Sequence, residues 1–107
     1  MSGRDPEPHY PEIPEPPSDC RITDSGSLAS VNPASIRALR PGSILRVQEI
    51  NPGAAPKLGA FDAATQVGRV VCRKELAILR CLAKGVPFEA EIQAINGGNI
   101  TVVVRNA

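Results

Sequence analysis

The chain of 107 residues has no tryptophan, one tyrosine, two phenylalanines and one histidine. That histidine, His9, lies in a proline-rich N-terminal stretch, so the rest of the chain can form no nucleophile–histidine pair and no histidine-containing metal site. Neither the phosphate-loop nor the dinucleotide glycine pattern occurs. The carboxylates are scattered, and Glu89 and Glu91 share one strand face, as solvated residues do. We therefore expect a protein that is not an enzyme and uses no metal or cofactor.

Long apolar runs are also missing. The N-terminus has no hydrophobic segment of the kind that signal peptides carry, and no stretch is long enough to cross a bilayer. The three cysteines, Cys20, Cys72 and Cys81, include no Cys-x-x-Cys pair. A free cysteine on or beside a helix usually behaves as a small hydrophobe. We therefore expect free thiols in a reduced, cytoplasmic protein without a membrane partner.

Proline and acidic residues are concentrated at the N-terminus. Residues 1–19 contain six of the eleven prolines, five acidic residues and one arginine, which is a formal charge of −4. This segment has few large apolar side chains, so we predict a disordered tail before a single domain, residues 20–107. In polyproline II, Pro8, Pro11, Pro14 and Pro17 would line one edge. A solvated leader explains this spacing more simply than a ligand for an aromatic groove, although both interpretations stay open.

The clearest structural pattern lies between residues 58 and 85. Two short apolar runs, 58–61 and 67–71, flank residues 62–65, a spacing typical of an antiparallel hairpin. The period then becomes helical over about 73–84, and Gly85 can take a left-handed C-cap. The predicted apolar stripe of this helix consists of Cys72, Leu76, Leu79 and Ala83, widened by Ile78 and Leu82.

The segment before this pattern is harder to interpret. A first strand is expected either at residues 21–23 or at residues 28–31. A short helix over about 33–39 begins with Asn32 as its N-cap and Pro33 at its first helical position.

Two further strand regions are predicted from alternation. Residues 43–50 form a strand, and the proline- and glycine-containing residues 51–56 form a loop. At the end of the chain, a three-residue loop over 96–98 joins two strands and places Ile92 opposite Val102. A two-residue loop would set apolar positions against polar ones.

Together these patterns predict an α+β, mainly β domain. Five or six short antiparallel strands form a small bent sheet or a partly open OB-like barrel, which one main helix closes.

The domain carries eleven Lys/Arg against six Asp/Glu, a formal charge of +5, which permits an anionic partner. Its basic residues crowd one region, namely Lys57, Arg69, Arg73, Lys74, Arg80 and Lys84. Arg73, Arg80 and Lys84 fall on one helix stripe, for which a solvated face is the simpler interpretation than phosphate binding. Phe61 and Phe88 lie in apolar alternation and are expected in the core rather than as platforms for base stacking.

Residues 41–95 resemble a HIRAN domain, a small module found fused to helicase-like chromatin and repair ATPases and also in small bacterial proteins. The matching parts are Pro41-Gly42, Glu49-Ile50-Asn51-Pro52, residues 58–61, Asp62, Val67-Gly68-Arg69-Val70, residues 73–77 and residues 88–92. The resemblance implies a HIRAN-like fold and a region that clamps the terminal nucleotide of a single-stranded 3′ end. In that region the family has an aromatic residue and an Asp, whereas this chain has residues 53–57, GAAPK. Only Asn51 and the basic residues about Lys57 and Lys74 carry over.

We therefore expect a non-catalytic binding module that contacts single-stranded DNA or DNA ends weakly through a basic face. The candidate residues are Asn51, Lys57, Arg69, Arg73, Lys74 and Arg80. The N-terminus of the main helix would add free N–H donors for phosphate. The alternative is a protein-interaction module that uses a sheet edge or the proline-rich tail. An enzyme completed by a second chain is a third interpretation, and it requires a deep polar cleft between subunits. The sequence indicates no oligomeric state.

Overall fold

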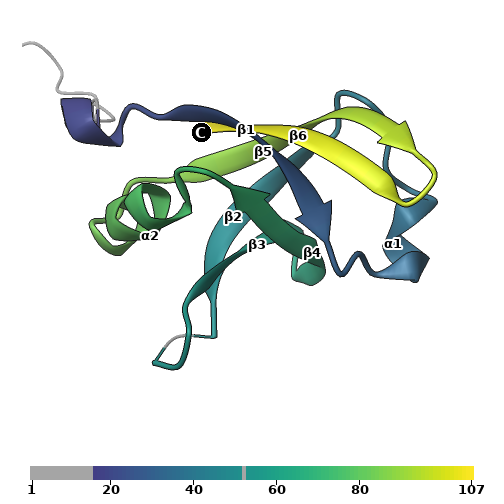
Figure 1. Cartoon of the computed structure of the whole chain (residues 1–107), viewed down its shortest axis with the longest axis horizontal. Helices are drawn as coiled ribbons and strands as arrows, with labels where there is room; N and C mark the ends of the chain where they lie inside the picture. Colours follow the sequence, from purple (N-terminus) through teal and green to yellow (C-terminus); the bar gives the residue numbers. More distant parts are fainter. Residues whose placement is uncertain (1–15, 52) are drawn as a thin grey trace, which may run out of the picture.

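In the computed structural model, which describes residues 16–51 and 53–107, six antiparallel strands close into a barrel in the order β1-β4-β3-β2-β5-β6 (Figure 1). The strands are β1 (Thr23–Ala29), β2 (Ile44–Ile50), β3 (Lys57–Asp62), β4 (Thr65–Cys72), β5 (Phe88–Asn96) and β6 (Asn99–Asn106). Within the same residues, the helical elements are the 3-10 turn η1 (Ser18–Cys20), the short helix α1 (Pro33–Ile36) and the main helix α2 (Glu75–Ala83). The predicted mainly β class, with six strands and one main helix, is confirmed.

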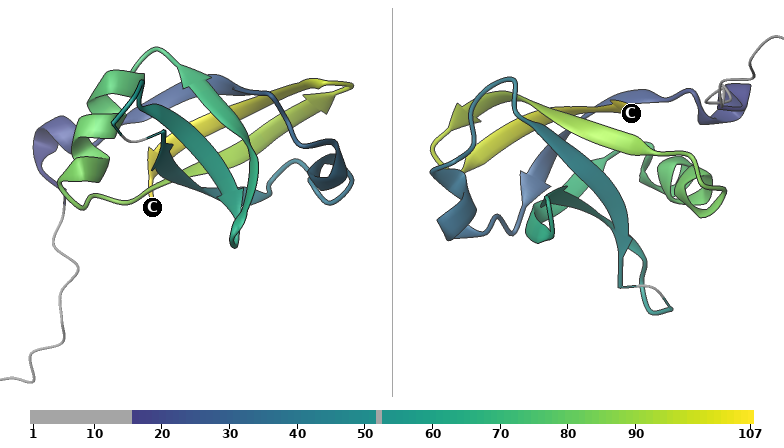
Figure 2. Two further views of the ribbon diagram at one scale, coloured as in Figure 1. Left: turned by 90° about the horizontal axis from the view of Figure 1, so that it is seen from below. Right: turned by 180° about the vertical axis from the view of Figure 1, so that it is seen from behind.

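The chain closes the barrel in three steps. Strands β2, β3 and β4 form a meander, α2 follows, and the hairpin of β5 and β6 returns to pair with β2. Strand β1 then lies between β4 and β6 and is antiparallel to both. The two helices lie at opposite ends of the barrel (Figure 2).

Alternate residues of β2, β5 and β6 make much of the core, and β3 and β4 add further buried residues. Phe88 is the largest fully buried side chain, and its partner on β2, Val47, is also buried. One glycine allows the barrel to close tightly, because a Cβ on Gly26 would lie 2.5 Å from the carbonyl oxygen of Val71 and 2.9 Å from the Cβ of Cys72. Strands β1 and β4 could not approach this closely with a side chain at position 26.

The turn between β5 and β6 differs from the prediction. Asn96 pairs with Asn99, so the loop has two residues, Gly97 and Gly98, instead of three. A register shift between Ile92 and Ala94 then restores the predicted partner of Ile92, which is Val102. A β-bulge inserts one extra residue into a strand, so the bulge supplies the residue that we expected in the loop.

The buried face of α2 agrees with the prediction only in part, because the predicted Ile78 is buried and Leu79 and Leu82 pack against the core. Within this helix, all of which is described, the buried residues are Ile78 and Cys81, whereas Leu76 is 69% exposed. The predicted stripe was counted from Cys72, but that residue belongs to β4. The orientation of α2 is consistent with the burial of Ile78, the Cys20–Cys81 bond and a hydrogen bond at 3.2 Å from the Leu58 N–H to the Glu75 carboxylate.

The helix caps, the start of α1 and the first strand agree better with the predictions from the sequence. The side chain of Asn32 accepts a hydrogen bond from the Ala34 N–H at 3.1 Å, and Pro33 opens α1 as predicted. Gly85, which follows α2, has a φ of 89°, so it takes the predicted left-handed conformation. The first strand, β1, lies between the two positions that the sequence suggested.

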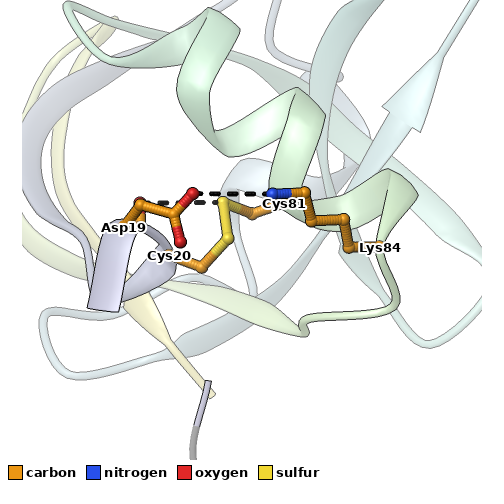
Figure 3. Close-up of polar contacts among 4 residues, drawn as sticks. All are labelled: Asp19, Cys20, Cys81 and Lys84. Carbon is orange, nitrogen blue, oxygen red and sulfur yellow. Dashed lines mark hydrogen bonds and ion pairs between the residues drawn. A yellow bond between two sulfur atoms is a disulfide. The ribbon is translucent and has the colours of Figure 1, made fainter. Parts of the chain in front are cut away.

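The expectation of three free thiols is wrong for two of them. Cys20 and Cys81 form a disulfide across a sequence separation of 61 residues, and Cys72 is free (Figure 3). Their two elements, η1 and α2, pack together. The predicted disordered tail falls mostly on residues 1–15, which lie outside the described residues, but Asp19 belongs to η1.

Candidate nucleic-acid interface

The outer face of β2, β3 and β4 brings several polar and basic residues side by side. On the central strand, Leu58 and Ala60 point into the core with no exposed surface. Their neighbours Gly59 and Phe61 therefore point outward. Gly59 pairs with Arg69 on β4 and with Gln48 on β2.

Two apolar side chains cover the outer surface of Gly59. A Cβ built on this glycine would lie 2.7 Å from Cγ2 of Ile50 and 3.0 Å from Cε1 of Phe61. Phe61 is half-buried here rather than part of the core, so the expectation that both phenylalanines are core residues holds only for Phe88. We call Ile50, Gly59 and Phe61 the apolar platform.

Arginines border this platform on two sides. Arg46 on β2 pairs with Phe61, and its Nη2 donates to the carbonyl oxygen of Ala63 at 3.0 Å. Arg69 on β4 lies beside Gly59, and its Nε is buried with no hydrogen-bond acceptor among the described residues. A buried donor without a protein acceptor is costly; Arg69 as a whole is partly exposed, so a ligand oxygen would meet the exposed part of this side chain rather than Nε.

Three of the six predicted site residues lie on or directly after the strands of this face, two lie in the connection that leaves β4 beside β1, and one lies apart. Asn51 follows β2, and Lys57 opens β3 opposite Ile50. Arg69, Arg73 and Lys74 lie along β4 and in the connection to α2. Arg80 is the exception, because it lies one residue before the buried Cys81 on the exposed face of the helix.

The N-terminus of α2 is less available than expected. The N–H of Lys74 already donates to Oδ2 of Asp24 at 2.9 Å, and Glu75 stands in the first turn. Two carboxylates therefore occupy the end of the helix dipole where a phosphate was expected. The same Asp24 raises the pKa of the nearby Cys72 thiol, after the larger effect of burial, to about 11.

The cations of this region form no ion pair with a carboxylate among the described residues. Among the described residues, ion pairs join Lys84 to Asp19, and Arg105 to Glu89 and Glu91, but none involves the basic residues of this region. The basic residues without a carboxylate partner are Arg46, Lys57, Arg69, Arg73 and Lys74, which we call the cationic rim. Arg46 and Phe61 were missed by sequence reasoning, although the alternation of Leu58 and Ala60 could have shown that Phe61 points outward.

Two absences concern only the part of the chain that the structure describes. It contains no group of His, Cys, Asp and Glu residues that could hold a metal ion. No helix among the described residues is long and apolar enough to span a bilayer.

Comparisons of the chain with family models, curated proteins and solved structures found no match. The resemblance to a HIRAN domain therefore stays a prediction from the sequence.

Proposed function

We propose that this protein is a non-catalytic binding module that contacts single-stranded nucleic acid through the outer face of β2, β3 and β4. The observation that carries the proposal is the apolar platform bordered by the cationic rim. Phe61 offers a partly exposed side chain, and no carboxylate among the described residues pairs with the surrounding cations.

The chemistry of a single strand fits this arrangement. Proteins that bind single strands combine a basic surface along the backbone with aromatic side chains on which bases stack. Here one base would stack on Phe61, while Arg69, Arg46 and Lys57 would contact the flanking phosphates. A base in a duplex is already stacked on its neighbours, so we expect duplex DNA to bind less tightly.

The order of elements adds an argument by analogy. In OB folds, the face of the second and third strands binds oligonucleotides. Counted from the start of the meander, β3 and β4 take those positions here, and the helix and hairpin follow in the same order. Fold analogy alone does not assign a function, so the proposal depends on the residues of the platform and rim.

The protein-interaction alternative has less support. A barrel whose strands are all paired has no free edge, and a sheet edge was one of the two surfaces that this alternative needed. The other surface, the proline-rich tail, lies mostly outside the described residues.

The cellular location that we propose differs from the cytoplasmic one that was expected from the sequence. Disulfides persist in oxidising compartments and are rare in the reducing cytosol. The cytoplasmic expectation depended on free thiols, and the Cys20–Cys81 bond removes that basis. We propose an oxidising environment for the form described here, and binding should be measured on that form.

A titration of labelled oligonucleotides with the oxidised chain tests the function. We expect weak, sequence-tolerant binding of a single strand and weaker binding of the duplex. If about three phosphates are contacted, the logarithm of the affinity should fall with the logarithm of salt concentration with a slope of about −2. No binding of the single strand at low salt and tens of micromolar protein would overturn the proposal.

A matched pair of variants locates the site. Lys57→Glu with Arg73→Glu should abolish binding without unfolding the protein, because both side chains lie at the surface or only partly below it. Arg37→Glu with Arg40→Glu makes the same change in net charge beside α1, at the opposite end of the barrel. This control should reduce the affinity by no more than about twofold at moderate salt, where long-range charge effects are screened. Equal losses in both variants would mean that only net charge matters.

A further inference from the structure

We propose that the Cys20–Cys81 disulfide is a redox clamp that holds α2 against the barrel when it is formed and releases the helix when it is reduced. The segment leading into α2 carries Arg73 and Lys74, so the clamp would also control the presentation of the cationic rim. This second part rests on the proposed function, whereas the first part does not.

Helix α2 needs an external anchor. It has nine residues, and its N-cap residue, Lys74, makes no side-chain capping bond among the described residues. Helices this short are marginal in water unless tertiary contacts hold them. Within α2, Ile78 and Cys81 are the buried residues, so one of its two buried side chains is half of the disulfide.

The other half of the disulfide is fixed to the barrel independently of α2. The side chain of Asn106, the last residue of β6, donates from Nδ2 to the carbonyl oxygen of Cys20 at 2.7 Å. Its Oδ1 accepts a hydrogen bond from the Ile22 N–H at 3.1 Å. The disulfide therefore connects the helix covalently to a segment that is bonded to the end of β6.

The remaining polar contacts between η1 and α2 are weak. Nζ of Lys84 lies 3.5 Å from Oδ2 of Asp19 (Figure 3), and the two side chains are 55% and 69% exposed. The Cys81 sulfur lies 3.9 Å from the carbonyl oxygen of Asp19. Exposed ion pairs contribute little to stability, so reduction would leave α2 with the buried Ile78, its partly buried apolar contacts and the Glu75 hydrogen bond as its main anchors.

Opening the clamp is a two-electron thiol–disulfide exchange. A thiolate of a small dithiol or a dithiol protein attacks one sulfur of the bond, which gives a mixed disulfide and releases the other cysteine as a thiolate. The second thiol of the reductant then displaces the attached cysteine. The reductant ends as a disulfide, and the two cysteine thiolates take up protons.

The location of the bond makes this exchange slow. Cys20 has no exposed surface and Cys81 is 3% exposed, so a reductant reaches them after η1 opens. The third cysteine, Cys72, is half-buried on β4, and the raised pKa of its thiol keeps it protonated near neutral pH. A protonated thiol is a poor nucleophile, so Cys72 would not readily exchange with the clamp.

Hydrogen exchange of the full chain before and after reduction with dithiothreitol tests the clamp. The experiment uses the Cys72→Ser background, so that no third thiol complicates the chemistry, and a stabilising osmolyte that keeps the reduced barrel folded. On reduction, the amides of residues 78–82 should exchange at least tenfold faster. The amides of β5 and β6 should change by less than about threefold. Cys20→Ala with Cys81→Ala should reproduce the reduced pattern.

Two results would overturn the clamp. Unchanged exchange in α2 would show that packing alone holds the helix. Equal acceleration in α2 and in the strands would show that the bond stabilises the whole domain rather than the position of one helix.

Oligonucleotide binding then tests the second part. Reduction should weaken binding of the single strand at least fivefold, and equal affinity of both forms, with α2 released, would refute the control of binding. If the oxidised protein does not bind at all, the proposed function fails, and the exchange experiment still decides the clamp.

Discussion

The β5–β6 hairpin and the β2–β3–β4 meander both contribute buried residues to one core, in strict alternation on the hairpin and with consecutive buried residues in β3 and β4. Their outer faces differ. On the hairpin, the guanidinium of Arg105 lies 2.8 Å from Glu89 and 2.7 Å from Glu91, so two carboxylates surround one cation. On the meander, the cations have no ion-pair partner among the described residues, and they border a partly exposed aromatic residue, Phe61.

This difference shows where function can be sought in a domain of this kind. The alternation of apolar residues identifies the buried side of the hairpin and of the meander equally well. It therefore cannot distinguish an outer face that binds a ligand from one that is only solvated. The distinction comes from the pairing of charges across strands, because directly opposite residues lie within contact distance. Glu89 stands opposite Arg105, whereas Arg69 stands opposite Gly59, which has no side chain.

The largest expected effect on stability distinguishes Phe88 from Phe61. Phe88 on the hairpin side is 1% exposed, so Phe88→Ala should lower the free energy of unfolding by about 3–5 kcal/mol. Phe61→Ala on the meander side should cost less in stability but should weaken single-strand binding. Urea unfolding and oligonucleotide titration of both variants measure the two effects. Equal losses of stability would show that Phe61 is a core residue after all.

The free cysteine at the end of the meander should be unreactive. Burial, and then the charge of Asp24, raise the pKa of Cys72 from 9.0 to about 11. At pH 8 its alkylation should therefore be about 100-fold slower than that of an unperturbed thiol. Because the pKa is higher in the folded state than in the unfolded state, the free energy of unfolding should fall as the pH rises from about 9 to about 11.

The rate of iodoacetamide alkylation against pH, followed by mass spectrometry, checks this prediction. Asp24→Asn keeps an oxygen acceptor for the Lys74 N–H but removes the negative charge, so alkylation should become faster. A half-maximal rate near pH 9 in the parent protein would contradict the predicted shift.

Much of the fold could be predicted from the sequence, because local patterns determine it. The C-cap at Gly85 and the N-cap at Asn32 follow from neighbouring residues, and both were predicted. The rotation of α2 could not be predicted, since its contacts join residues far apart in the chain, among them the hydrogen bond between Glu75 and Leu58, which lie 17 residues apart. The Cys20–Cys81 bond was missed for the same reason, because nothing local indicates that η1 and α2 pack together.

The candidate site shows the same limit. Lys57, Arg73 and Lys74 were found as a charge cluster in the sequence. Arg46 was missed, because β2 precedes that cluster in the chain and reaches it only through its pairing with β3. The shielding of the α2 N-terminus by Asp24 was also missed, since β1 is 50 residues away from Lys74.

Replacing each of two glycines tests how closely β4 is approached by its neighbouring strands, β1 on one side and β3 on the other. Gly26→Ala should lower the free energy of unfolding by about 1–3 kcal/mol, because the new Cβ would meet backbone of β4, which cannot move without shifting the strand. In Gly59→Ala the new Cβ would meet side chains, Ile50 and Phe61, which can rotate. That variant should lose at most about 1 kcal/mol, but single-strand binding should weaken about threefold as the platform is displaced. Thermal unfolding and titration of both variants check the contrast, and a larger stability loss for Gly59→Ala would reverse it.

The variant with the smallest expected effect tests whether an unpaired cation is enough to create a binding face. Glu89→Gln with Glu91→Gln should release Arg105 on the hairpin and lower the stability only slightly, since these partly exposed ion pairs are screened by solvent. The hairpin face would then carry an unpaired guanidinium, but no aromatic ring points outward from it, because Phe88 is buried. We therefore expect the affinity for a single-stranded oligonucleotide to rise by less than about twofold at moderate salt. A gain of tenfold or more would mean that charge alone selects the ligand, and the importance given to Phe61 on the meander would then be misplaced.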